Sequence, residues 1–360
     1  MRHQAPHFFL EKLPPKREKL ETIKILKQES KAAAALAELK GIAKTIPNQS
    51  MLINAVVLRE AKDSSEIENI ITTQDELYKA LSIKSPNISP QAKEVVNYRK
   101  ALFLGYDMIK KQGYLRVNDI IKIQQELEAN RAGIRAFPGT ALKNERTGET
   151  VYTPPQSKDE ILDLLDNFIQ HFNMNDEDLS PLINMAVLHA QFESIHPFYD
   201  GNGRTGRILN LLYLILNQLM DVPILYLSSY IIEYKPDYYR TLNNINKSQD
   251  WEGFVLFLLK TVEMTAKKTT ERIELIRILL EESINKAQNE ASKIYRKELI
   301  ELLFEQPYCK IEFVVDHLGV ERKAASRYLQ ELESIGLLKS LKIGRENLYI
   351  NHKLMDILKA

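Results

Sequence analysis

Apolar residues recur at intervals of three and four along most of this chain, the spacing that buries one face of an α-helix. Pro14-Pro15 precedes a run rich in Ala, Leu and Lys, which are strong helix formers. Further along, Thr73 and Glu76 have the spacing of a capping box at a helix start. The pattern predicts helices over residues 16–45, 51–69, 92–112, 117–131 and 251–290, and one that begins near residue 73.

Two of the predicted helices flank a single polar loop. Ser180-Pro181 is a strong helix start, because a capping side chain precedes proline at the first helical position. Apolar residues follow at helical spacing to about Ile195, and a second helix runs from Arg204 to about Met220. This second helix is apolar on nearly all sides but is interrupted by polar residues. It is too short and too polar to span a bilayer, so it is expected in the core.

Between residues 133 and 155 the composition changes to Gly, Pro and Thr. Two short extended segments, "TALKN" and "TVYT", lie on either side of a connector that includes Arg146, Thr147 and Gly148. This pattern predicts a β-hairpin from Thr140 to Thr153. Pro154-Pro155 ends the hairpin, and Ser157 is the expected N-cap of the next helix.

The last 70 residues read as helix, turn, helix, turn with Gly319, helix, and a small hairpin about Gly344, the layout of a winged helix-turn-helix. The sequence therefore predicts an all-α fold with two small β elements. We expect three parts: an N-terminal helical region over residues 1–112, a helical core over 113–290, and a winged-helix module over 291–360.

Composition narrows the class of protein. The 49 basic and 48 acidic residues give a net charge of +1, which argues against an obligate nucleic-acid coat or a polybasic membrane anchor. The single cysteine, Cys309, rules out an internal disulfide and fits a reducing compartment. The N-terminus lacks the apolar core of a signal peptide. We expect a cytoplasmic protein with no membrane partner.

The loop "HPFYDGNGRTGR", residues 196–207, carries three glycines at G-x-G-x-x-G spacing. A dinucleotide fingerprint with this spacing must follow a β-strand, whereas a helix leads into this loop. A Walker A loop is excluded too, because no lysine follows the glycines in G-K-[ST] order. Neither common nucleotide-binding motif explains the loop.

The residue types in the loop still favour phosphate chemistry. Glycines let backbone N–H groups converge on an anion at the start of a helix. Arg204 and Arg207, in the first turn of the next helix, can pair with phosphate oxygens, and Asn202 can donate a hydrogen bond to them. Asp200 can hold a magnesium ion, and His196 is placed to accept a proton from a hydroxyl.

This string matches HPF-x-[DE]-GNGR-x-x-R, the signature of the Fic family, at every defined position. The segment "SSEIEN", residues 64–69, resembles the family's inhibitory motif [ST]-x-x-x-E-[GN], and its place before the core resembles the branch with an N-terminal inhibitory helix. The preceding hairpin and the terminal winged helix also lie in family order. A kinase-like branch has lysine where Gly203 stands, so the resemblance favours nucleotidyl transfer.

The resemblance implies a protein adenylyltransferase that moves AMP from ATP to a Tyr, Thr or Ser hydroxyl of a target protein, or of itself. His196 is then the catalytic base, Asp200 holds Mg2+, and Glu68 inhibits by pairing with Arg207. Ser64 and Asn69 complete the inhibitory motif. The residues expected to bind ATP and its phosphates are Gly201, Asn202, Gly203, Arg204, Thr205, Gly206, Arg207 and, as a wall of the adenine pocket, Tyr238.

Other interpretations stay open beside these. The hairpin is either decoration or a flap that aligns the target by strand addition, with Lys143 and Val151 near its edge. Ser64 and Glu68 share one helix face and could be simple surface. The resemblance leaves room for the reverse reaction, removal of AMP from proteins.

The winged helix allows a different class of function. Its expected recognition helix carries Arg322, Lys323 and Arg327, but the segment from Arg296 onward has eleven basic and ten acidic residues, whereas a DNA reader has a basic face. A protein-docking or homodimer-forming module is the preferred interpretation. A DNA-binding regulator whose core senses nucleotide is the alternative.

Overall fold

The computed structural model describes residues 10–82, 89–143, 148–174, 179–343 and 346–359. Within them the chain is mostly helical, which confirms the predicted fold class. Within these ranges a short 3-10 helix at Arg17–Lys19 precedes fifteen α-helices: α1 (Ile23–Ala43), α2 (Gln49–Ile67), α3 (Gln74–Ser82), α4 (Pro90–Gln112), α5 (Val117–Glu128), α6 (Lys158–Asn173), α7 (Pro181–Ile195), α8 (Asn202–Leu216), α9 (Ser228–Glu233), α10 (Lys235–Ser248), α11 (Trp251–Glu290), α12 (Lys297–Glu305), α13 (Ile311–Leu318), α14 (Arg322–Ser334) and α15 (His352–Lys359).

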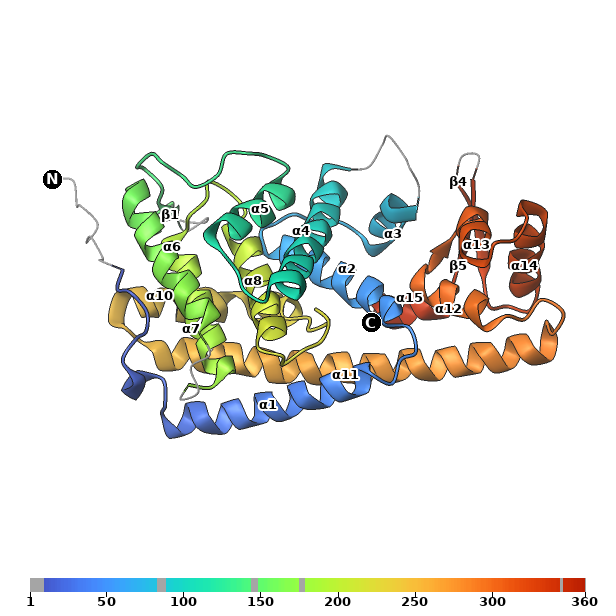
Figure 1. The fold of residues 1–360 in the computed structure, drawn as a ribbon, viewed down its shortest axis with the longest axis horizontal. Helices are drawn as coiled ribbons and strands as arrows, with labels where there is room; N and C mark the ends of the chain where they lie inside the picture. Colours follow the sequence, from blue (N-terminus) through green and yellow to red (C-terminus); the bar gives the residue numbers. More distant parts are fainter. Residues whose placement is uncertain (1–9, 83–88, 144–147, 175–178, 344–345, 360) are drawn as a thin grey trace.

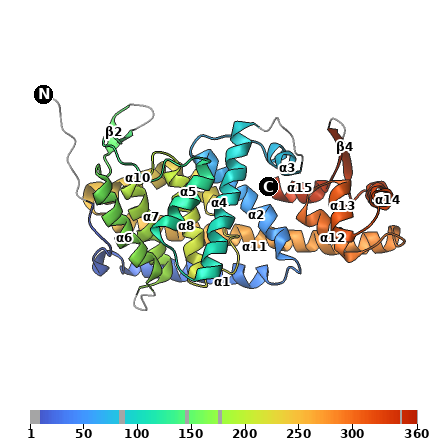
Figure 2. The same ribbon diagram turned by 45° about the horizontal axis from the view of Figure 1, so that its top comes forward.

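The molecule is elongated along one helix. Figure 1 shows α11 running nearly the whole length, with α1 packed beside it. Helices α4 to α8 stand above α11 at one end, and α12 to α15 gather at the other end (Figures 1 and 2). Helix α2 lies between these two groups, and both of them contact it.

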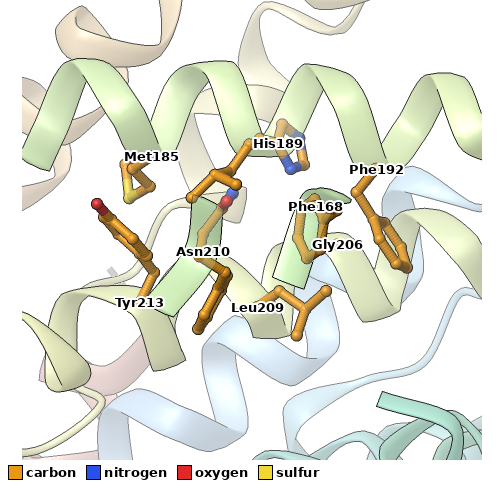
Figure 3. Close-up of a pocket in the computed structure, with 10 residues that line it drawn as sticks. Phe168, Met185, His189, Phe192, Gly206, Leu209, Asn210 and Tyr213 are labelled. Carbon is orange, nitrogen blue, oxygen red and sulfur yellow. The ribbon is translucent and has the colours of Figure 1, made fainter. Parts of the chain in front are cut away.

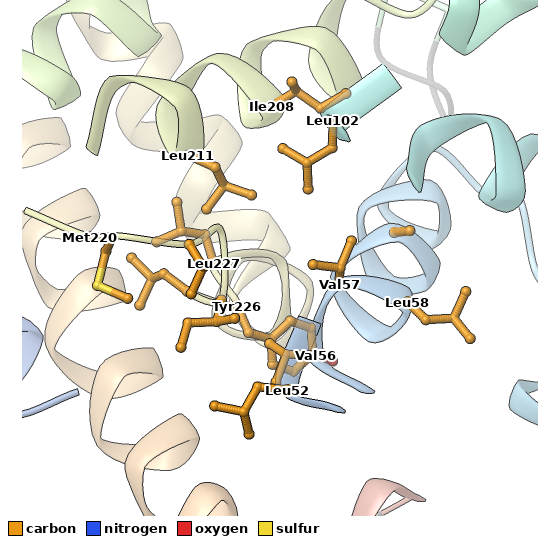
Figure 4. Close-up of a cluster of buried hydrophobic side chains, with 14 of the residues drawn as sticks. Leu52, Val56, Val57, Leu58, Leu102, Ile208, Leu211, Met220, Tyr226 and Leu227 are labelled. Carbon is orange, nitrogen blue, oxygen red and sulfur yellow. The ribbon is translucent and has the colours of Figure 1, made fainter. Parts of the chain in front are cut away.

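The core is centred on α7 and α8. Residues 182–195 of α7 are all buried, as are most of α8, because both helices are surrounded by other helices. Figure 4 shows apolar side chains of α2, α4 and α8 meeting the segment that follows α8, including Leu52, Leu102, Leu211 and Tyr226. The loop between α7 and α8 is therefore held by two buried helices.

Several predicted helix ends have the expected physical cause. Thr73 and Glu76 form the reciprocal backbone bonds of a capping box, and the Ser157 and Ser180 hydroxyls each accept a bond from a backbone N–H in the following first turn. Other boundaries differ from the prediction. The helix predicted over 16–45 begins only at Ile23, and α8 spans 202–216 rather than 204–220.

The predicted hairpin is present. Strands β1 (Leu142–Lys143) and β2 (Thr150–Tyr152) pair antiparallel, with Leu142 opposite Tyr152. The predicted connector residues Arg146 and Thr147 lie outside the described residues. The hairpin precedes α6 and lies near the loop, because the Tyr152 hydroxyl donates a hydrogen bond to the Ser194 carbonyl at 3.0 Å.

The C-terminal module, residues 297–359, has the element order of a winged helix-turn-helix. Strands β3 (Tyr308–Cys309), β4 (Lys339–Ile343) and β5 (Glu346–Ile350) form one antiparallel sheet in the order β3-β5-β4. Gly319 caps α13 with φ 63°, whereas the predicted turn residue Gly344 lies outside the described residues. The predicted domain limits at 112 and 290 coincide with the ends of α4 and α11, and the division itself remains a prediction. No helix in the described ranges is long and apolar enough to cross a membrane.

Candidate active site

His196 ends α7 in the left-handed conformation, with φ 47°. Such a conformation is rare for a residue with a Cβ and needs support from its surroundings. Arg135 supplies it: its Nε donates to the His196 carbonyl at 2.7 Å, and Nη2 donates to the Ile195 carbonyl at 3.2 Å and to the Pro155 carbonyl. Sequence reasoning missed Arg135, which lies 61 residues before His196 and is 1% exposed.

The same arginine acts on the imidazole of His196. Burial, and next the positive charge of Arg135, lower the pKa of His196 to about 4. The ring is therefore neutral near pH 7, the protonation state that a general base requires. The ordinary pKa of histidine would leave part of the population protonated at that pH.

Phe198 and Asn202 fix the middle of the loop. Phe198 is fully buried, and its backbone N–H and carbonyl bond to the Asn202 carboxamide at 2.8 Å each. Asn202 is 3% exposed and uses both polar atoms of its side chain in these bonds. We expected this side chain to donate to phosphate, but in the structure it braces the loop instead.

Asp200 is the exposed carboxylate of the loop, with a side chain 75% accessible to solvent. One of its oxygens, Oδ1, accepts a bond from the Gly201 backbone at 2.7 Å. Gly201 has φ 77°, a conformation that favours glycine, and a Cβ there would lie 2.3 Å from a Glu128 oxygen, so a larger residue would strain the backbone and displace the Glu128 side chain. No group of three acidic, His or Cys side chains suited to a metal occurs within the described ranges.

Arg204 has carboxylate partners in the structure, and its predicted contact with phosphate remains a prediction. Its guanidinium is 3% exposed and pairs with Glu94 and Glu128 at 2.9 Å each, and with Asp200 at 3.7 Å. These contacts join α8 to α4 and α5, so the side chain is engaged by carboxylates rather than open to phosphate. Thr205 is fully buried, and a Cβ on Gly206 would lie 2.4 Å from a Glu193 oxygen. Both positions face the interior in the structure, and their predicted contact with ATP remains a prediction.

Arg207 meets the predicted inhibitory motif. Its Nε donates to the Ser64 hydroxyl at 2.7 Å, and Nη2 donates to the Ser64 carbonyl at 2.8 Å and to Glu68 Oε1 at 2.9 Å. The guanidinium is 1% exposed, whereas the Glu68 side chain is 33% exposed. Burial alone would raise the pKa of Glu68, but the charge and hydrogen bond of Arg207 hold this pKa below its usual value. Glu68 is therefore ionised at neutral pH.

The Glu68 carboxylate also covers the start of α8. A Cβ built on Gly203 would lie 2.3 Å from Glu68 Oε1 and 3.0 Å from Arg207 Nη1. This is the first turn of the helix, where free N–H groups and the helix dipole favour an anion. Asn69 follows with φ 63° and accepts a bond from Lys235 at 3.4 Å. The motif thus lies at the C-terminal end of α2, directly over the first turn of α8, where phosphate is predicted to bind.

Tyr238 does not line an open pocket. Its side chain is 1% exposed, and its hydroxyl lies 2.9 Å from His189 Nε2 within an aromatic cluster that includes Phe254. The predicted role as an adenine wall is not supported by this position. The cavity beside His189, shown in Figure 3, measures about 10 Å³ and can hold no more than a water.

Glu193 is a second carboxylate near Arg207 that sequence reasoning missed. It lies on α7 one turn before His196, is 9% exposed, and its Oε1 has no hydrogen-bond partner within the described chain. Burial raises the pKa of Glu193 to about 7, although Arg207 draws it down. The one carboxylate in a helix that is otherwise free of Asp, Glu, Lys and Arg residues was the available signal, because burying a lone carboxylate is costly.

The two flap residues differ in exposure. Lys143 on β1 is exposed, and Val151 on β2 is half-buried. Lys143 is opposite Thr150 in the pairing. Their predicted contact with a target segment remains a prediction.

The fold and site define a helical protein whose loop presents a neutral histidine and an exposed carboxylate, and whose following helix begins at an arginine-based anion site. Three family models match in order: "Fic/DOC family N-terminal" over residues 26–107, "Fic/DOC family" over 114–214, and "Protein adenylyltransferase SoFic-like, C-terminal domain" over 279–354. The chain is a Fic/DOC family protein with a SoFic-like C-terminal domain.

Curated relatives carry related names. "Protein adenylyltransferase Fic" of Nematostella vectensis is 30% identical over 182 residues, or 48% of this chain and 38% of the relative. "Protein adenylyltransferase fic-1" of Caenorhabditis briggsae is 26% identical over 180 residues, or 49% of this chain and 33% of the relative. The matched part is thus well under half of either relative.

Among solved structures, a Fic family protein from Desulfovibrio desulfuricans G20 superposes with a TM-score of 0.60. It covers 92% of this chain and 96% of its own, at 18% identity. At this identity the likeness concerns the fold, which extends across both ends of the molecule.

Proposed function

We propose that the protein transfers AMP from ATP to a hydroxyl group of a protein. The observation that carries this proposal is the anion site at the start of α8: the Glu68 carboxylate is bonded to Arg207 there, where a phosphate group would bind. A neutral histidine ends the helix before it, on the other side of a short loop. The names of the relatives support the same activity.

The chemistry is a displacement at the α-phosphorus of ATP. The oxygen of a Tyr, Thr or Ser side chain forms a bond to this phosphorus, and the bond from phosphorus to the bridging oxygen of pyrophosphate breaks. His196 accepts the proton of the hydroxyl, and pyrophosphate leaves with the bonding electrons. Proton removal by a placed base contributes about 10²–10⁴ in rate.

The donor set fits a magnesium–ATP complex. Mg2+ commonly takes one or two protein carboxylates and completes its shell with phosphate oxygens and water. Asp200 provides one exposed carboxylate at the loop and would hold the ion, which would neutralise phosphate charge. Backbone N–H groups at Asn202 and Gly203 face the phosphates, and Arg207 binds the γ-phosphate.

Autoinhibition is part of the proposal. Glu68 and the γ-phosphate compete for the same guanidinium, so ATP binds with its γ-phosphate displaced and its α-phosphate out of line with the hydroxyl. Misorientation of this size costs about 10²-fold or more in rate. The wild-type protein is then nearly silent on its own.

The test uses ATP labelled at the α- or the γ-phosphate, with the Glu68→Gly variant as enzyme and magnesium present or removed. We expect covalent label on protein from α-labelled ATP only, and none without magnesium. His196→Ala should lose at least 100-fold in rate while binding ATP with nearly unchanged affinity. Label arriving only from γ-labelled ATP would show a kinase, and normal turnover of His196→Ala would remove this residue from the mechanism.

A further inference from the structure

Helix α2 is held at its start by the C-terminal module. The Asn48 side chain, its N-cap, donates to Glu305 Oε2 at 3.3 Å, and Asn54 Nδ2 donates to the Glu305 carbonyl at 3.2 Å. Glu305 is the last residue of α12, which packs along α2. Figure 1 shows α2 extending from this module toward α8.

The last helix of the chain holds the middle of α2. Arg59 Nη1 donates to the Leu358 carbonyl of α15 at 2.9 Å, while its Nε donates to the Tyr226 hydroxyl at 2.8 Å. One guanidinium thus joins the module, α2 and the core. Arg59 lies five residues before Ser64, or about 7.5 Å along the helix axis.

The element after the inhibitory motif is held as well. Asp75 of α3 accepts a bond from the Tyr308 hydroxyl at 2.8 Å and pairs with Lys359 at 3.1 Å. The rings of Tyr78 and Tyr308 are stacked, 5.6 Å apart and inclined by 6°. Ser64 and Glu68 therefore lie at the C-terminal end of α2, just before α3, and the module contacts both helices.

We infer that the C-terminal module is part of the inhibitory device: by holding α2 and α3 it keeps Glu68 on Arg207. This inference rests on the proposed AMP transfer. No glycine or proline interrupts residues 48–67, so α2 is expected to move as a rigid helix. Contacts that fix Asn48 and Arg59 then also restrict the position of its C-terminal end, where Ser64 and Glu68 lie. Helix α2 is also fixed to the core by Glu60, which accepts bonds from the Ser228 backbone and hydroxyl. Loosening the module consequently shifts the population of released Glu68 without detaching the helix.

The experiment removes three side-chain contacts from the module side, with Glu305→Ala, Tyr308→Phe and Lys359→Ala in one chain. The bonds of Asn54 and Arg59 to backbone carbonyls of the module remain. Self-AMP transfer should rise about two- to tenfold, which is the shift expected when part of the free energy of these three contacts acts on the position of Glu68. Hydrogen exchange at residues 60–69 should become faster. The matched control is Glu312→Ala with Arg322→Ala, which removes a 3.6 Å ion pair of the module that involves neither α2 nor α3 and should change neither readout.

The Glu68→Gly background separates the inference from the proposed function. There the triple variant should give no further increase, because the contact that the module maintains is already absent. A folded triple variant with wild-type transfer and wild-type exchange, beside an active Glu68→Gly enzyme, overturns the inference. An inactive Glu68→Gly enzyme counts against the proposed function, and hydrogen exchange then decides the inference alone. If the triple variant does not fold, Tyr308→Phe, which keeps the stacked ring, takes its place in both assays.

Discussion

Replacing Glu68 by glycine should activate the enzyme, and the structure sets the size of the effect. The change removes one charge-assisted bond, from Arg207 Nη2 to Glu68 at 2.9 Å. Bonds to charged groups contribute about 1.5–3 kcal/mol, which corresponds to about 10- to 150-fold in the population of released Arg207. Because Glu68 is 33% exposed, solvent screening places the expected increase toward the lower end of this range.

Arg207 should stay in place when Glu68 is removed. Its bonds to the Ser64 hydroxyl and carbonyl are unaffected, so the guanidinium remains oriented for a phosphate. Glu68→Asp should be partly active, because the aspartate side chain is one methylene shorter and its carboxylate reaches Arg207 less well. Arg207→Ala should be inactive whether or not Glu68 is present, since both ligands depend on it.

The assay is the initial rate of AMP incorporation from α-labelled ATP, with ATP affinity measured separately by calorimetry. The expected pattern is an increase of at least tenfold in Glu68→Gly, a smaller increase in Glu68→Asp, and none in the Arg207 variants. If Glu68→Gly folds and binds ATP but is no faster than wild type, the pair between Glu68 and Arg207 is not inhibitory. Ser64, which is buried, and Glu68 would then serve only to hold Arg207 in the folded core.

Three further predictions concern other parts of the chain. Burial raises the pKa of Glu193 to about 7, so this carboxyl stabilises the fold below its unfolded pKa, and that stability is lost as the pH rises through 7. Glu193→Gln should therefore raise the melting temperature more at pH 8 than at pH 5. An equal gain at both pH values would contradict this reasoning. Gly206→Ala should lower the melting temperature because its Cβ would lie 2.4 Å from the Glu193 carboxylate, and Glu193→Ala in the same chain should restore part of the loss. Duplex DNA should show no mobility shift with the protein at low salt, and a salt-dependent shift would revive the DNA-binding alternative.

The contiguous part of the site could be predicted from the sequence because its chemistry is local. His196, the glycines and Asp200 lie in one loop whose flanking helices have strong caps and unbroken apolar spacing. Even the distant inhibitory segment carried a motif, and the structure places Ser64 and Glu68 on Arg207. Local signals therefore predicted which residues the loop presents, but not all of their partners, since the Asn202 carboxamide bonds to Phe198 of the same loop.

For several site residues the structure shows partners that the sequence analysis did not predict. Whether an arginine faces a phosphate or a carboxylate depends on which acidic residues the tertiary fold brings to it, and the partners of Arg204 come from α4 and α5. The Asn202 side chain is hydrogen-bonded to the backbone of its own loop, and the Tyr238 hydroxyl is within hydrogen-bond distance of His189 in the core. Arg135 has no local pattern at all, because its acceptors become neighbours only when the loop before the hairpin packs against the end of α7.

The location of Arg207 is compatible with the exchange of its counter-ion that the proposed autoinhibition requires. Removing one partner of a fully buried ion pair costs about 3–5 kcal/mol, since a charge is left unpaired in the interior. Here the cation is 1% exposed, but the carboxylate that leaves is on the solvent side, where γ-phosphate would also arrive. Ser64 keeps two of the guanidinium bonds, and Glu193, whose pKa is sensitive to the Arg207 charge, lies on the buried side. Glu68 can therefore withdraw at a lower cost than a buried partner could, and this difference makes the contact suitable as a switch rather than as a structural ion pair.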